Sequence, residues 1–156
     1  MELKDLKKEY EKLAKKYSLP KFEELNNEFE IERFDKQTEI LARVVRRIAI
    51  DKIYYFNNFI ESVTLNPMNA PRFYLPYVRN LTDSDKQKIS KVYSEFAKLI
   101  LASIECEALN DEKRDAELVK EIYKVWMEHK QIIGEVISAM RFGKNETKQK
   151  EGSYVG

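Results

Sequence analysis

The sequence contains only one cysteine and one histidine, and this scarcity excludes several kinds of site. With Cys106 alone, the chain cannot form an intramolecular disulfide. With His129 alone, it cannot build a metal site from two histidines of one chain. Di-iron helical proteins use Glu-x-x-His pairs, whereas the residue three positions before His129 is Trp126. We therefore expect no metal centre of the ferritin type.

Long hydrophobic runs are also missing. The longest purely apolar run is Leu99-Ile-Leu-Ala102, far short of the roughly 20 residues that span a bilayer. The first residues, Met-Glu-Leu-Lys-Asp-Leu-Lys-Lys, are charged from the second position and contain no hydrophobic signal segment. We expect a cytoplasmic protein with no membrane partner.

Neither sign of charge is in excess. The 28 Lys and Arg residues against 27 Asp and Glu residues give a net charge of +1, and the two signs are interleaved along the chain. A dedicated nucleic-acid binder usually carries a basic excess or a segregated basic stripe. Net charge therefore does not support nucleic acid as a partner, although local patches remain open.

The motifs of common enzyme sites are absent as well. No P-loop, GxGxxG or HExxH pattern occurs, and no nucleophile elbow is recognisable. Cys106 lies between Glu105 and Glu107, whose carboxylates should raise rather than lower the thiol pKa. We expect a protein that is not an enzyme and that holds no cofactor, and we read His129 as a buried histidine with ordinary partners.

What the sequence does contain is amphipathic helix. Only four glycines and four prolines occur, with 43% hydrophobic and 35% charged residues, which favours long helices over a turn-rich β fold. Apolar residues recur three and four positions apart, as on one face of a helix. The stripes are Leu3, Leu6, Tyr10, Leu13 and Tyr17; Phe22, Leu25 and Phe29; Leu41, Val44, Val45, Ile48, Ile53, Phe56, Ile60 and Val63; Ile89, Val92, Tyr93, Phe96, Leu99, Ile100 and Ile104; and Val119, Ile122, Trp126, His129, Ile133, Val136 and Met140.

Helix boundaries follow from capping residues. Asp35 is a plausible N-cap for a third helix that reaches Leu65, and Thr82-Asp-Ser-Asp85 is a capping signal for the fourth. In the third stripe the register slips between Ile48 and Ile53, which indicates a bend or a second neighbour. The predicted fold is all-α: an antiparallel bundle of about five helices, in a single domain over 1–142, with a disordered polar tail over 143–156.

Residues 66–77 interrupt this pattern with three prolines and three aromatic residues. We expect Pro67, Pro71 and Pro76 to order the segment. They would hold Phe73, Tyr74 and Tyr77 against the third and fourth helices, so that Phe73→Ala costs about 3–5 kcal/mol of stability. Alternatively, the aromatics together with Arg72 and Arg79 form a protein interface or a nucleic-acid surface.

Arg43, Arg46 and Arg47 form a second cluster, on the third helix. Arginines grouped in this way can contact phosphates. The alternative is a solvated face with local ion pairs, because Glu39 precedes Arg43 by four residues and Asp51 follows Arg47 by four. This second interpretation is favoured, and it leaves only Arg46 without a charged partner at that spacing.

A family resemblance covers about the first third of the chain. The segment Leu19-Pro-Lys-Phe-Glu-Glu-Leu-Asn-Asn-Glu-Phe-Glu-Ile31, followed by Glu39-Ile-Leu-Ala-Arg-Val-Val-Arg-Arg47, resembles small uncharacterised all-helical proteins of archaea. The resemblance implies a cytoplasmic archaeal protein and no biochemical role.

Wide apolar stripes on five helices offer more apolar surface than one small bundle must bury. The sequence therefore predicts a helical interaction or scaffold protein that associates with itself or with a protein partner. The alternative is a nucleic-acid-associated protein that uses arginine and aromatic patches. The candidate surface residues are Arg43, Arg46, Arg47, Arg72, Phe73, Tyr74, Tyr77 and Arg79.

Overall fold

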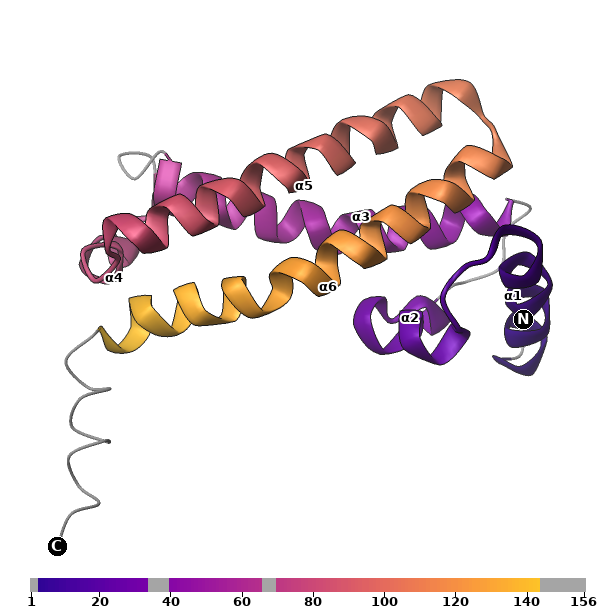
Figure 1. Cartoon of the computed structure of the whole chain (residues 1–156), viewed down its shortest axis with the longest axis horizontal. Helices are drawn as coiled ribbons and strands as arrows, with labels where there is room; N and C mark the ends of the chain where they lie inside the picture. The colour runs from indigo at the N-terminus through magenta and orange to yellow at the C-terminus, as the bar shows by residue number, and fades with distance from the viewer. Residues whose placement is uncertain (1–2, 34–39, 66–69, 144–156) are drawn as a thin grey trace, which may run out of the picture. The chain divides into compact units, whose positions relative to one another are not determined.

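Helices account for the regular structure of the chain in the computed structural model, which describes residues 3–33, 40–65 and 70–143 (Figure 1). These residues contain six α-helices and no strand. In chain order they are α1 (Leu3–Tyr17), α2 (Phe22–Phe29), α3 (Leu41–Ile60), α4 (Leu75–Val78), α5 (Asp83–Leu109) and α6 (Glu112–Phe142). The all-helical class is confirmed, and the expected number of helices was too low because the proline-rich connector contains the short α4.

Shorter helical turns link these elements. Two 3-10 turns cover Ile31–Arg33 and Arg72–Tyr74, and a π-helical turn over Glu61–Leu65 follows α3. Pro71 immediately precedes the turn at Arg72–Tyr74, and Pro76 lies in the first turn of α4. Proline is tolerated at both places because the first helical residues need no backbone donor.

The contacts within the chain define two compact units. The first comprises Met1–Tyr55 and Phe96–Trp126, and the second comprises Phe56–Glu95 and Met127–Gly156, so that α3, α5 and α6 contribute to both. The single domain over 1–142 stays a prediction. Of the predicted tail, 144–156 lies outside the described residues, and Gly143 ends α6 at φ 64, a left-handed conformation that suits glycine.

The caps of the two longest helices are formed by side chains. The backbone N–H of Asp85 donates to Thr82 Oγ1 at 3.2 Å, and the N–H of Thr82 donates to Asp85 Oδ2 at 2.9 Å. This reciprocal pair confirms the predicted capping signal before α5. The N–H of Lys113 donates to Asp111 Oδ1 at 2.9 Å at the start of α6. The predicted cap Asp35 lies outside the described residues.

The buried face of α3 differs from the predicted one. Its buried positions continue along one side of the helix without interruption, and two of them, Arg46 and Asn57, are polar: Ala42, Val45, Arg46, Ala49, Ile50, Ile53, Asn57 and Ile60. The predicted register slip between Ile48 and Ile53 is therefore wrong, because the buried Ala49 and Ile50 continue the buried face across this interval. The predicted stripe of α6, in contrast, is buried at all seven positions from Val119 to Met140.

Aromatic side chains organise the core of the first unit. The ring of Trp126 lies 6.4 Å from the rings of both Phe96 and Phe29, and its indole N–H donates to Glu28 Oε2 at 2.7 Å. Burial of each such ring contributes about 1.5–3 kcal/mol, and the indole hydrogen bond satisfies the one polar group of Trp126.

The second unit joins the connector to the ends of α3 and α6. Tyr74 packs edge-on against Phe59, with ring centroids 5.8 Å apart. Nearby, Asn80 donates its side-chain amide N–H to the carbonyl of Met140 at 2.8 Å. These contacts fix the short turns of residues 70–80 on the second unit.

Candidate interaction surfaces

Arg46 of α3 is fully buried in the first unit. Its Nε lies 2.6 Å from Asp115 Oδ1 on α6, and its Nη1 donates to the hydroxyl of Ser103 and to the Ser103 carbonyl at 3.3 Å. The prediction that the three arginines form a solvated face is therefore wrong for Arg46. A guanidinium in this position cannot contact a phosphate or a protein partner.

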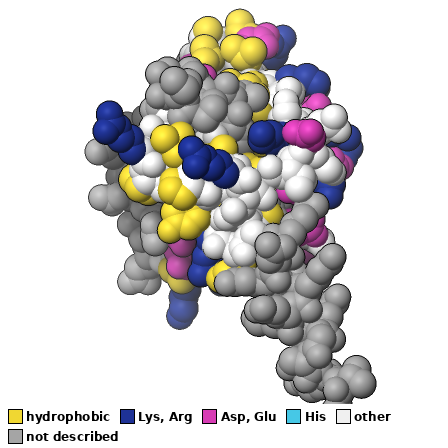
Figure 2. Space-filling view, turned by 90° about the vertical axis from the view of Figure 1, so that its left-hand side faces the viewer, with side chains coloured by type: hydrophobic (Ala, Val, Ile, Leu, Met, Phe, Trp, Pro, Cys, Tyr) yellow, Lys and Arg dark blue, Asp and Glu magenta, His cyan; other side chains and the backbone are white. Residues whose placement is uncertain are grey.

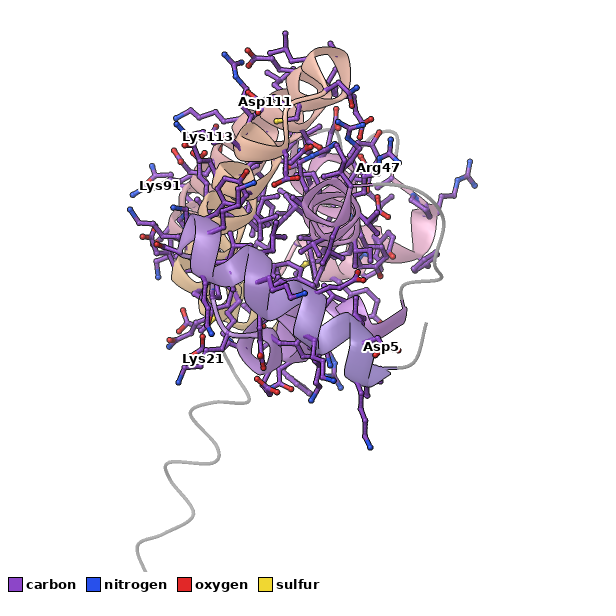
Figure 3. All side chains as sticks on the ribbon, turned by 90° about the vertical axis from the view of Figure 1, so that its right-hand side faces the viewer. Asp5, Lys21, Arg47, Lys91, Asp111 and Lys113 are labelled. Atoms are coloured by element: carbon purple, nitrogen blue, oxygen red, sulfur yellow. The ribbon has the colours of Figure 1, made fainter. Side chains whose placement is uncertain are left out.

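Glu107 of α5 joins two of the arginines. Its Oε1 accepts from Arg46 Nη2 at 2.5 Å, and its two oxygens accept from Arg47 Nε and Nη2, both at 2.8 Å. Hydrogen bonds from Arg47 first and from Arg46 second lower the pKa of Glu107 to about 2. Arg47 lies on α3 (Figure 3), so this bidentate pair connects two helices.

Arg43 completes the cluster. Its Nε lies 3.4 Å from Asp115 Oδ2, and 14% of its side chain is exposed. Glu39, its expected partner, lies outside the described residues. Three guanidinium groups thus surround two carboxylates. This network connects helices α3, α5 and α6 within the first unit. Removal of one member would leave an uncompensated buried charge.

Cys106 and His129 are both buried. Burial first, and then the carboxylate of Asp115, raise the pKa of the Cys106 thiol, in the expected direction although for a different leading reason. A thiol in this state is a weak nucleophile. Among the described residues, no group of three or more His, Cys, Asp or Glu side chains is placed to hold a metal ion.

The aromatic residues of the connector are not clamped as predicted. Phe73 is 64% exposed and Tyr77 is 45% exposed, whereas Tyr74 is half-buried against Phe59. The expected burial of Phe73 is therefore wrong. Pro71 and Pro76 begin short helical turns that turn the ring of Phe73 outward, while Pro67 lies outside the described residues.

These aromatic residues line a groove in the second unit. The groove has a volume of about 540 Å³ and is open to solvent. Figure 2, viewed from the side on which α4 lies in Figure 1, shows hydrophobic side chains gathered beside Lys and Arg side chains. The lining residues, which we call the aromatic groove, are Phe59, Phe73, Tyr74, Tyr77, Ile137, Met140, Arg141 and Phe142.

A second apolar surface lies on α5 in the first unit. Phe96, Leu99, Ser103 and Cys106 form the buried side of this helix. On the other side, Leu101 is 67% exposed and Ile104 is 61% exposed, with Ala97 and Ala108 one turn away in each direction. We call Ala97, Leu101, Ile104 and Ala108 the outer stripe of α5. The predicted stripe of α5 is buried at Ile89, Val92, Phe96 and Leu99, whereas Ile104, which the sequence placed in the same stripe, is exposed.

Comparison with known proteins gives no information on function, so the proposals below are argued from the structure alone. No protein-family model matches the chain, and neither curated proteins nor solved structures give a significant match. In the part of the chain that the structure describes, no helix combines the length and the apolar character needed to cross a membrane.

Proposed function

We propose that this chain is a non-enzymatic helical interaction protein that associates with a second copy of itself through the outer stripe of α5. The proposal rests on the observation that α5 is apolar on two opposite sides. The first unit covers one of these sides and leaves the outer stripe exposed. Exposed leucine and isoleucine side chains arranged along a helix typically mark a protein-interaction site.

The spacing of the outer stripe fits another helix. Its residues are four, three and four positions apart, which is the spacing of a helix–helix seam. Lys98 and Glu105 follow Ala97 and Ile104 at equivalent positions, so an antiparallel copy brings opposite charges together. A two-fold interface of this kind uses the same surface on both copies. The proposal includes an antiparallel arrangement of the helices, which the link of only two residues between α5 and α6 supports. It also includes a cytoplasmic location and an archaeal source, as the sequence predicts.

Binding of nucleic acid has less support as an alternative. Arg46 is buried, and Arg43 and Arg47 lie within ion-pair distance of carboxylates. Only Arg72 and Arg79 of the proposed arginine set remain beside exposed aromatics. Filter binding to DNA and RNA at low salt tests this alternative, because each phosphate contact adds about one unit to the negative salt slope of binding.

A charge in the outer stripe should separate the copies. We expect Ile104→Glu to convert the associated protein to a monomer in size-exclusion chromatography with light scattering, since a buried unpaired carboxylate opposes association. Gln87→Glu adds the same charge to an exposed position of α5 outside the stripe, and it should leave the measured mass of the assembly unchanged. If Ile104→Glu associates as strongly as the unmodified protein, the outer stripe is not the interface.

A further inference from the structure

The arginines of the two units differ in their ion pairing. In the first unit, the four described arginine side chains each lie within ion-pair distance of a carboxylate: Arg43, Arg46, Arg47 and Arg114. In the second unit, Arg72, Arg79 and Arg141 make no ion pair with the carboxylates that the structure describes. The positive charge of these three side chains is therefore available to a partner.

All three belong to the segments that form the aromatic groove. Arg141 lines the groove itself, next to Phe142. Arg72 immediately precedes Phe73 in the turn Arg72–Tyr74, and Arg79 follows the last residue of α4. Among the described residues, no acidic side chain lines the groove. Arg141 is thus the basic residue of the groove lining, and Arg72 and Arg79 each lie within two residues of a lining residue in the chain. We call these three arginines the arginine rim. Arginine with aromatic residues is the composition enriched in protein interfaces.

The lining of the groove suits the amino-acid side chains of a peptide better than the bases of a nucleic acid. Ile137 and Met140 of α6 contribute aliphatic surface to the groove, which the rings of Phe73 and Tyr77 also line. Methionine adapts its shape to apolar ligands, and about 540 Å³ has room for a few hydrophobic side chains. A nucleic-acid platform instead needs a basic track, whereas the whole chain has a net charge of +1.

We propose that the aromatic groove binds an acidic peptide segment of another protein, whose apolar side chains enter the groove while its carboxylates pair with the arginine rim. Arginine is suited to this role because its planar guanidinium holds a carboxylate through two hydrogen bonds. The groove lies in the second unit and the outer stripe in the first.

A synthetic probe tests the site directly. The probe is a short fluorescein-labelled peptide in which Phe and Leu alternate with Asp and Glu, titrated with the full chain in fluorescence anisotropy. We expect saturable binding that weakens about tenfold or more in Phe73→Ala and in Arg79→Glu, as at interface hot spots. Tyr54→Ala, which removes an exposed aromatic residue from the first unit, should bind the probe unchanged. A peptide with Lys in place of the acidic residues should also bind about tenfold or more weakly.

Folding of each variant is checked by circular dichroism. Phe142→Ala, which removes another aromatic ring from the groove lining, serves as a second groove variant. The proposal is overturned if the probe does not bind, or if the groove variants bind it like the unmodified protein. Binding of oligouridine RNA that depends on Phe73 and exceeds binding of the probe would make the groove a nucleic-acid site. Loss of self-association in Phe73→Ala would make it an interface between copies.

Discussion

Arg46 has the largest fully buried side chain among the described residues. Its guanidinium is enclosed between α3, α5 and α6 and satisfies Asp115, Glu107 and Ser103. An isolated buried charge is strongly unfavourable, so the members of this network stabilise the fold only together.

Removal of Arg46 should therefore be costly. We expect Arg46→Met to lower the free energy of unfolding by roughly 3 kcal/mol, because Asp115 stays buried with only Arg43 nearby at 3.4 Å. Urea denaturation measures the change. Arg114→Met removes an exposed ion pair with Glu105 and should cost less than about 1 kcal/mol. Equal losses in the two variants would show that burial of Arg46 contributes nothing specific.

Glu107 should make stability sensitive to acid. Its pKa of about 2 in the folded protein is lower than the ordinary value of 4.5, so the folded state favours the ionised carboxylate. The stabilisation is complete above about pH 4.5 and is lost as the pH falls toward 2. We expect Glu107→Gln to destabilise the protein more at about pH 6 than at about pH 2. The contrary result is a loss of stability that does not depend on pH, and Glu105→Gln on the exposed part of α5 is the matched control.

At the level of elements, the sequence predicts the buried face of α6 from Val119 onward but that of α3 only in part, and the reason is physical. Each buried position of α6 from Val119 to Met140 is apolar or a weakly polar histidine, so the spacing alone reveals the buried face. In α3, Arg46 takes a core position because Asp115, 69 residues away, compensates its charge. No local pattern identifies a partner that far along the chain, so an apolar pattern does not reveal that Arg46 is buried.

For the aromatic groove, too, the sequence reveals only the part of the site that lies within one segment, the connector. The sequence correctly singled out Arg72, Phe73, Tyr74 and Tyr77 as the unusual segment, but aromatic character does not distinguish a buried ring from an exposed one. Ile137 and Met140 of the groove lining lie more than sixty residues beyond Phe73, and nothing near the connector indicates them.

This exposure changes the expected effect of a mutation in the connector. With 64% of Phe73 accessible to solvent, we expect Phe73→Ala to lower the free energy of unfolding by less than about 1 kcal/mol, in place of the 3–5 kcal/mol of a core aromatic. Thermal denaturation of the variant beside Phe96→Ala, a fully buried ring, provides the contrast. A loss for Phe73→Ala near that of Phe96→Ala would mean that the ring is covered in solution.

At the level of the whole molecule, two apolar surfaces remain after each unit has formed its core. The outer stripe of α5 has the spacing of a helix–helix seam, and the aromatic groove carries the arginine rim. One suits a second copy of the chain and the other suits an acidic peptide. We propose on this basis that the protein assembles with itself and binds another protein, as a scaffold does.

Sedimentation equilibrium of the unmodified protein at micromolar concentration tests this account most directly. We predict a mass that rises with concentration above the 18.5 kDa of one chain and approaches twice that value, because the outer stripes of two copies cover each other. A single species of 18.5 kDa at every concentration would contradict self-association and, with it, the central claim.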